Sequence, residues 1–277
     1  MSAATTISWT DQTWNPTSGC DRLSPGCDHC YALTLAKRLK AMGQPRYQND
    51  GDPRTSGPGF KLTLHPEALD EPLYWRKPRR VFVNSMSDLF HKDVPATFVG
   101  SVWNTMAIAE RHTFQILTKR PHRMASILLD FEQAGWTWRR HDLHWCGPVR
   151  GPLANVWLGT SIETDRYTFR ADYLRDTPAA VRFLSLEPLL GPLPSLDLTG
   201  IDWVIIGGES GPGARPMELA WAEDIAARAQ AAGVAVFVKQ LGTVTGGRTH
   251  QDVDTFPASL RLRDFPRAGN PPERTTP

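Results

Sequence analysis

The sequence has few cysteines, almost no net charge and no long apolar segment. It carries 4 cysteines in 277 residues, and 31 lysines and arginines stand against 29 aspartates and glutamates. No stretch of about 18 consecutive apolar residues occurs, so we expect no transmembrane helix. The first residues hold no basic segment followed by an apolar core, so we expect no secretory signal, a cytoplasmic location and no membrane partner. The small net charge by itself gives no argument for nucleic-acid binding.

Short apolar runs alternate with helix-like segments along most of the chain. The runs are rich in β-branched and aromatic residues without strict alternation, which is typical of strands buried on both faces of a parallel sheet. We predict strands at 81–84, 113–117, 155–160, 181–185, 202–206 and 234–238, and earlier ones at 6–10 and 61–65. We predict helices at 31–42, 66–74, 95–109, 121–130, 164–176 and 218–232. This order predicts an α/β fold, a partial or complete (β/α) barrel with six to seven mainly parallel strands. An open doubly wound sheet is the alternative.

Three stretches interrupt this alternation. Residues 44–60 are rich in glycine and proline, 131–154 are too long for a plain connection, and 242–277 lose apolar periodicity. We therefore predict one barrel-like domain over 1–241 with an insertion at 131–154, followed by an irregular C-terminal tail over 242–277.

The cysteines are unevenly placed. Cys20, Cys27 and Cys30 lie within eleven residues in a C-x6-C-x2-C pattern, on a loop that contains Gly19, Pro25 and Gly26. Clustered cysteines in a reducing compartment more often bind metal or do chemistry than form disulfides. Three interpretations stay open: unconnected thiols, a structural zinc, and an iron–sulfur cluster with three protein ligands. A zinc would need a fourth ligand, for which the candidates are His29, His141, His144 and Cys146.

This arrangement resembles the radical S-adenosylmethionine (SAM) superfamily. Those enzymes carry three cysteines in the loop after the first strand of a partial or full (β/α) barrel, most often spaced C-x3-C-x2-C, and here the first gap has six residues. The chain is more closely similar to a phage-associated three-cysteine-motif family of unknown function, through segments such as WNPTSGCDRLSPGCDHCYA, VFVNSMSDLFH, RFLSLEPLLGP and DWVIIGGESGPGARPM. The resemblance implies that Cys20, Cys27 and Cys30 bind a 4Fe–4S cluster that reductively cleaves SAM, with electrons from a separate donor.

Polar or charged residues follow six successive apolar runs. Ligands bind at the carboxyl ends of strands in barrels and open α/β sheets, so these residues should surround one cavity that faces the cysteine loop. The predicted cofactor-binding residues are Ser85, Asp88, Lys119, Ser161, Glu163, Glu187, Gly207, Gly208, Glu209 and Arg215. Lys119, Arg120 or Arg215 could pair with the SAM carboxylate. Asp88, Glu163 or Glu187 could bind its amine or its ribose hydroxyls.

Basic clusters at 76–80, 119–123 and 139–141 make a nucleotide or nucleic acid a candidate substrate, since tryptophans at 136, 138 and 145 lie near the last of them. We predict a radical SAM-like enzyme with an unidentified substrate. The alternative is a non-catalytic zinc- or cluster-containing nucleic-acid-binding protein. A metal-dependent hydrolase has no HxH or HExxH spacing in its favour.

Overall fold

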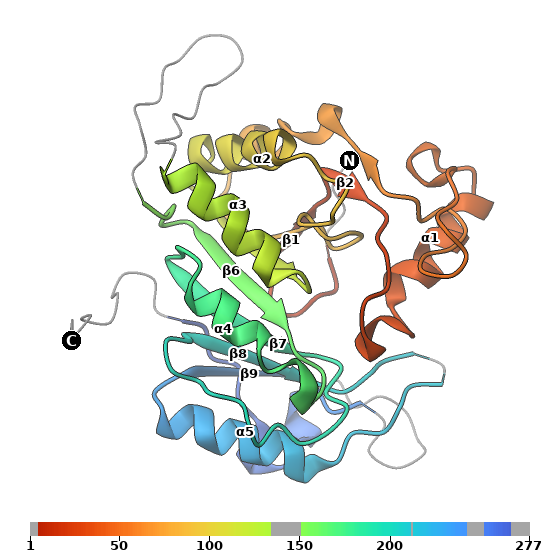
Figure 1. Cartoon of the computed structure of the whole chain (residues 1–277). Coiled ribbons are helices and arrows are strands. Elements are labelled where there is room, and N and C mark those ends of the chain that lie inside the picture. Colours follow the sequence, from red (N-terminus) through yellow and green to blue (C-terminus); the bar gives the residue numbers. More distant parts are fainter. Residues whose placement is uncertain (1–4, 134–150, 212, 243–251, 267–277) are drawn as a thin grey trace.

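A curled sheet of seven parallel strands forms the centre of the molecule (Figure 1). The computed structural model describes residues 5–133, 151–211, 213–242 and 252–266. The strands are β1 (Gln12–Trp14), β4 (Arg80–Val83), β5 (Thr113–Thr118), β6 (Val156–Ser161), β7 (Val181–Leu186), β8 (Trp203–Gly207) and β9 (Ala235–Gln240). Each strand pairs in parallel with the next one along the chain in this order. The sheet is an open half-barrel, so the predicted partial (β/α) barrel is confirmed.

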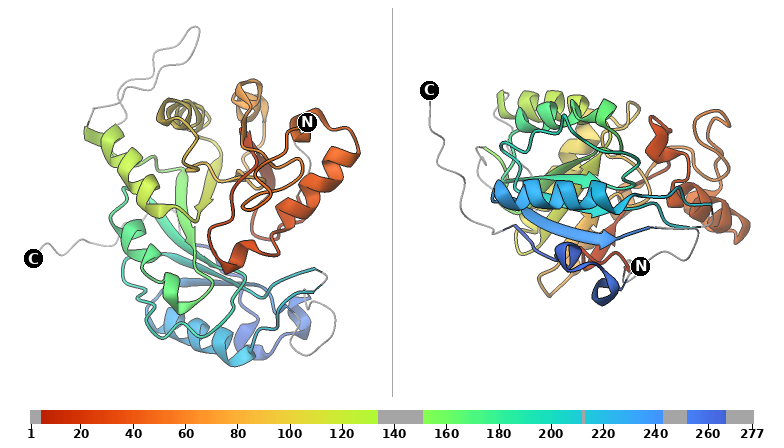
Figure 2. Two further views of the ribbon diagram at one scale, coloured as in Figure 1. Left: turned by 45° about the vertical axis from the view of Figure 1, so that its right-hand side comes forward. Right: turned by 90° about the horizontal axis from the view of Figure 1, so that it is seen from below.

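The helices lie mainly outside this sheet. They are α1 (Tyr31–Ala41), α2 (Ala96–Ile108), α3 (Pro121–Gln133), α4 (Arg170–Arg175) and α5 (Leu219–Ala231). Helices α2 to α5 pack their apolar residues against the outward-facing strand residues in the main core. Helix α1 and the cysteine loop lie to one side of the sheet and have a small core of their own (Figure 2). No helix within the described ranges is both long and apolar enough to cross a membrane.

Four predicted elements differ from the structure. The first strand lies at Gln12–Trp14 instead of 6–10, and the strand predicted at 61–65 is only β3 (Thr63–Leu64), which pairs antiparallel with β2 (Thr17–Ser18) outside the main sheet. The helix predicted at 66–74 is two 3-10 helices, Pro66–Ala68 and Glu71–Tyr74, each with a proline in its first turn. The helix predicted at 164–176 is a 3-10 turn (Asp165–Tyr167) followed by α4.

The inward-facing side of the half-barrel has its own aromatic core. Phe82, Trp157, Phe183, Trp203 and Phe237 come from five different strands and are all buried. Trp9 packs among them. Because Trp9 is buried, the apolar pattern at 6–10 is like that of a strand. Gly159 leaves room for this core, because a Cβ there would lie 2.5 Å from the Phe183 ring.

The two ends of the described chain meet across the open side of the sheet. Val238 donates a backbone hydrogen bond to the Leu262 carbonyl, which extends the β9 edge by a short antiparallel contact. Arg263 donates to the Ser8 hydroxyl at 3.1 Å, and Phe265 packs on Trp203. The described part of the C-terminal segment, 252–266, is thus irregular but attached to the barrel. The predicted insertion, with Cys146, His141 and His144, lies mostly outside the described residues.

Candidate functional site

The cysteine loop begins directly after β2 and ends at α1. Gly19 has a φ of +85°, and a Cβ there would lie 2.2 Å from the Lys61 carbonyl oxygen, so glycine is required where the loop leaves the strand. Pro25–Cys27 form a 3-10 helix, and Cys30 is the N-cap residue of α1. Cys30 therefore lies at the positive end of the helix dipole, which favours an anionic group there.

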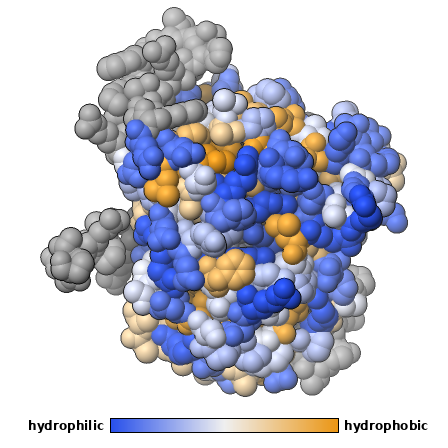
Figure 3. Space-filling model, in the orientation of Figure 1, coloured by the Kyte–Doolittle hydropathy of each residue, from blue (hydrophilic) through white to orange (hydrophobic). Residues whose placement is uncertain are grey.

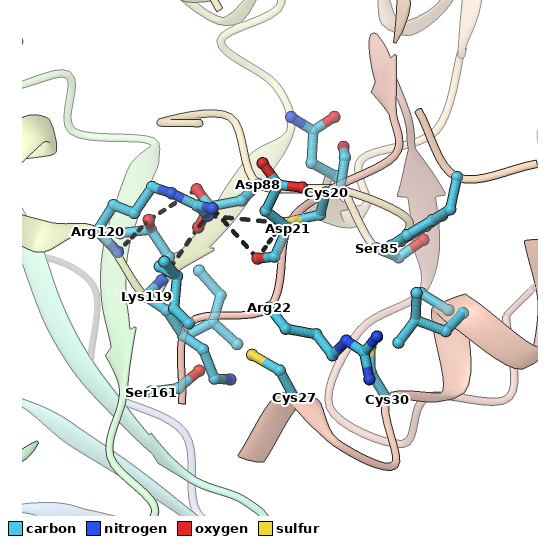
Figure 4. A pocket seen from close by; sticks show the side chains of 18 of the residues that line it. Cys20, Asp21, Arg22, Cys27, Cys30, Ser85, Asp88, Lys119, Arg120 and Ser161 are labelled. Atoms are coloured by element: carbon cyan, nitrogen blue, oxygen red, sulfur yellow. Dashed lines mark hydrogen bonds and ion pairs between the residues drawn. The ribbon is translucent and has the colours of Figure 1, made fainter. Parts of the chain in front are cut away.

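All three cysteines line one cavity, which holds about 680 Å³ of empty space. Cys27 and Cys30 lie on the loop side, and Cys20 lies beside the Asp88–Arg120 ion pair (Figure 4). The three thiols come from a single loop, but the opposite wall comes from the carboxyl ends of β4, β5 and β6, through Ser85, Lys119 and Ser161. The cysteine loop and these strand ends therefore line the same cavity.

Arg120 supplies a buried positive charge next to Cys20. Its Nη1 lies 3.5 Å from the Cys20 Sγ and 2.8 Å from the Asp88 Oδ2. Burial raises the pKa of the Cys20 thiol to about 12, and the Asp88 charge acts in the same direction against Arg120. Burial also raises the pKa of Cys30. Binding of a metal by these thiols would therefore release protons.

Asp88 is fully occupied within the protein. Its carboxylate accepts hydrogen bonds from the Thr118 hydroxyl at 2.7 Å, the Phe90 backbone N–H at 3.0 Å and the Lys119 backbone N–H at 3.2 Å, in addition to the Arg120 guanidinium. We infer that Asp88 positions Arg120 and the strand-end residues around it.

A second lobe of the cavity adjoins the first and holds about 810 Å³ of empty space. The two lobes share five lining residues, Cys30, Phe82, Leu117, Lys119 and Ser161. Ser185, Glu187 and Lys239 line the second lobe only, and the aromatic core lies below them. Lys239 donates to the Glu187 carboxylate at 2.7 Å, but the Lys119 ammonium has no ion pair with any residue that the structure describes.

A buried carboxylate attaches the cysteine loop to the turn after β8. Glu209 accepts hydrogen bonds from His29 Nδ1 and from the Arg215 backbone N–H, both at 2.9 Å, and it forms an ion pair with the Arg215 guanidinium. Arg215 also donates to the Pro25 carbonyl at 2.8 Å. Burial acts to raise the pKa of Glu209, but the hydrogen bonds from Arg215 and His29 outweigh it and hold the pKa below its usual range. We call these four residues, His29, Pro25, Glu209 and Arg215, the loop clamp.

Comparison with known proteins places the chain in a family without an assigned activity. A family described as proteins of unknown function, DUF5131, matches residues 4–257. The chain belongs to the DUF5131 family. Comparison with curated proteins and with solved structures gave no significant match. The DUF5131 match covers both lobes of the cavity and the loop clamp, so these features lie within the family region.

Most of the predicted site residues surround the cavity in this DUF5131 chain. Those that line one or both lobes are Cys20, Cys27, Cys30, Ser85, Asp88, Lys119, Ser161, Glu187, Gly208 and Glu209. Arg215 acts in the loop clamp instead. Gly207 lies against the Glu187 side chain, where a Cβ would come within 3.2 Å, and Gly208 is packed against Gly242. The glycines of this turn thus serve close packing inside the protein.

Glu163 lies beneath the cysteine loop and does not line either lobe. It is fully buried, forms an ion pair with Arg170 at 2.9 Å and touches the loop at Gly26. Its Oε1 has no hydrogen-bond partner in the described part of the chain. We infer that Glu163 supports the loop from below.

The predicted cofactor-binding residues do not include Asn84, Arg22 or Trp9, although Asn84 is one of the polar residues expected at a strand end. Asn84 lines the first lobe, is 2% exposed and has a φ of +62°, and its Nδ2 has no hydrogen-bond partner among the described residues. Arg22 lines the same lobe and donates to the Thr55 carbonyl. The position of Asn84 directly after β4 is the signal that marks it in the sequence, whereas Trp9 lies in a segment whose apolar pattern is typical of a strand.

Proposed function

We propose that this chain is a radical SAM-like enzyme in which Cys20, Cys27 and Cys30 hold a 4Fe–4S cluster and the second lobe binds SAM. The observation that carries the proposal is the shared wall of the two lobes, because Cys30 and Lys119 belong to both. When bound, the cluster supplies an electron that cleaves SAM and starts radical chemistry on the substrate. Protein residues would bind, orient and shield these groups.

The donor set supports a cluster better than a single metal ion. Ligands of one zinc ion must all lie about 2.0–2.3 Å from it. His29, the described candidate for a fourth zinc ligand, is instead hydrogen-bonded to Glu209. An iron–sulfur cluster with three cysteine ligands takes each cysteine on a different iron. The three cysteines that line the first lobe would supply such a ligand set.

The second lobe has polar groups of the kinds that SAM would need, above an apolar floor. Lys119 offers an ammonium group without an ion-pair partner in the described chain, which suits the SAM carboxylate. Glu187 and Ser185 offer oxygens for its amine and ribose hydroxyls. Trp9 and Phe82 line the same lobe and exclude water from its floor.

Anaerobic reconstitution tests the proposal directly. Purified protein should take up iron and sulfide in about equal amounts, and addition of SAM with a reductant should release 5′-deoxyadenosine. Cys30→Ala should abolish iron binding, and Cys146→Ala is the matched control that should retain it. Bound zinc without iron would contradict the proposal. Loss of iron in Cys146→Ala would contradict the three-ligand assignment. We also propose a cytoplasmic location, where an electron donor is available.

A further inference from the structure

Three exposed aromatic rings and one half-buried ring, that of Tyr167, lie on the outer rim of the half-barrel, beside α3 and α4. The rings belong to His122, Tyr167, Phe169 and Tyr173, which we call the aromatic rim. Phe169 is 50% exposed and Tyr173 is 43% exposed. His122 contacts Tyr173 at a centroid distance of 6.1 Å, and Phe169 contacts Tyr173 at 6.4 Å. Figure 1 shows α3 and α4 next to each other on the outer side of β6.

Arg170 connects the aromatic rim with a residue that lines the cavity. The Arg170 guanidinium lies 4.2 Å from the Tyr167 ring centroid and donates to the Ser161 carbonyl at 2.8 Å. Ser161 lines both lobes, and Lys119 lies three residues before His122 in the chain. The aromatic rim therefore stands at the carboxyl ends of β5 and β6, the same end of the sheet as the cysteines.

An arginine at the aromatic rim is available to a negatively charged ligand. Arg166 is exposed, lies 6.0 Å from the Tyr167 ring and forms no ion pair with any described residue. Of the neighbouring acids, Asp172 pairs with Arg175, and Asp165 accepts hydrogen bonds from Ser195. By contrast, the basic cluster at 76–80 lies at the amino end of β4, and there Arg80 pairs with Asp11.

The composition of the aromatic rim separates it from an ordinary protein-docking surface. In the described chain, the exposed large aliphatic side chains are Leu23, Leu35 and Met42, on the cysteine loop and around α1, and none of them lies in the rim. The face seen in Figure 3 is mainly hydrophilic with separate hydrophobic spots. Exposed rings beside an unpaired arginine, with little aliphatic surface, are typical of platforms that stack nucleic-acid bases.

We propose that the aromatic rim binds unpaired bases of a single-stranded nucleic acid, which is the substrate presented to the neighbouring cavity. Phe169 and Tyr173 meet at 83°, so their edge-on contact leaves a ring face of the pair open for a base. Arg166 contacts a phosphate of the same strand. The assignment of this ligand as substrate rests on the proposed function, whereas the binding surface itself does not require a cluster.

Fluorescence anisotropy with a labelled single-stranded DNA, an RNA of the same sequence and the matching DNA duplex tests the surface. One of the single strands should bind more tightly than the duplex. Phe169→Ala and Tyr173→Ala should each weaken that binding about tenfold, the loss expected for one stacked base. Arg166→Gln should reduce the salt dependence of binding by a slope of about 0.7 for one lost phosphate contact. Tyr74→Ala, which removes a 77% exposed ring elsewhere, should have no effect.

Equal binding of the duplex, or unchanged single-strand binding in the Phe169→Ala, Tyr173→Ala double variant, would overturn the proposal. The proposal would also be overturned if the protein bound anionic phospholipid vesicles through the same rings and did not bind the oligonucleotide. The iron and sulfide content of the double variant separates the binding surface from the proposed enzyme function. This content should equal that of the unaltered protein, because the two rings hold no part of the cluster. If no preparation takes up iron but the rings still govern oligonucleotide binding, the proposed enzyme function fails and the binding surface stands.

Discussion

On the inward-facing side of the sheet, the amino ends and the carboxyl ends of the strands carry different kinds of side chain. In β7 the inward residues run from Phe183 to Ser185, and in β9 they run from Phe237 to Lys239. The amino end is filled with buried rings that contact one another, whereas the carboxyl end is polar and leaves the two-lobed cavity. The same strands thus supply both a buried aromatic core and a polar cavity. Substitutions at the aromatic end should therefore change mainly the stability of the protein, whereas substitutions at the polar end should change mainly ligand binding.

The largest expected effect is on stability, at the aromatic end. Trp203 is fully buried, contacts five other rings of the inward core and donates to the Asp264 carbonyl at 2.9 Å. Trp203→Ala should lower the free energy of unfolding by about 3–5 kcal/mol, because it leaves a large cavity. Chemical denaturation would measure this loss.

Lys119→Met is the matched change at the polar end. It should alter the free energy of unfolding by less than about 0.5 kcal/mol, because the Lys119 ammonium forms no ion pair in the described structure. It should weaken SAM binding about tenfold to a hundredfold through loss of a charged hydrogen bond. The comparison between the two ends breaks down if Lys119→Met destabilises the protein as much as Trp203→Ala does.

The next prediction concerns local opening at the loop clamp, which joins the cysteine loop to the polar end. Glu209→Gln removes the charge that pairs with Arg215 and weakens the hydrogen bond from His29. We expect the backbone amides of Cys27 and Asp28 to exchange with solvent about tenfold faster, since the loop opens locally more often. Hydrogen–deuterium exchange would detect this change. Asp172→Asn, which removes an exposed pair with Arg175, is the control that should leave these amides unaffected.

Much of the fold could be read from the sequence because its strands are buried on both faces. The apolar run at 81–84 became Arg80–Val83, and 234–238 became Ala235–Gln240. The first strand was missed because QTW carries little apolar signal, while the apolar Trp9 nearby packs into the interior instead. The pattern of apolar residues reports burial, and burial alone does not distinguish a strand from a segment that fills a barrel.

The cavity could be predicted because carboxyl strand ends share one edge, but its internal pairings could not. Asp88, Glu163 and Glu209 were all expected to contact a cofactor, yet each is engaged by an arginine of the chain itself. The contact between His29 and Glu209 joins residues 180 positions apart, and no local pattern signals it. Which acids serve the protein and which remain for a ligand depends on three-dimensional contacts that residue types do not specify.

The smallest expected effect is the pH dependence of stability at the amino end. His112 precedes β5, is 1% exposed and contacts the rings of Trp75 and Phe114. Burial lowers its pKa from the ordinary value near 6.5, so the unfolded chain takes up a proton at a higher pH than the folded chain does. The contribution to stability is therefore complete above about pH 6.5 and declines as the pH falls below that value.

His112→Gln should flatten part of this decline, since glutamine does not titrate. Urea denaturation of the unaltered protein and the variant, between about pH 5 and pH 7.5, would measure the two slopes. His65, whose pKa burial also lowers, should maintain the rest of the slope in the variant. Identical slopes for the two proteins would contradict the assignment. A reduced slope would show that His112, at the amino end of β5, contributes to acid stability in this range.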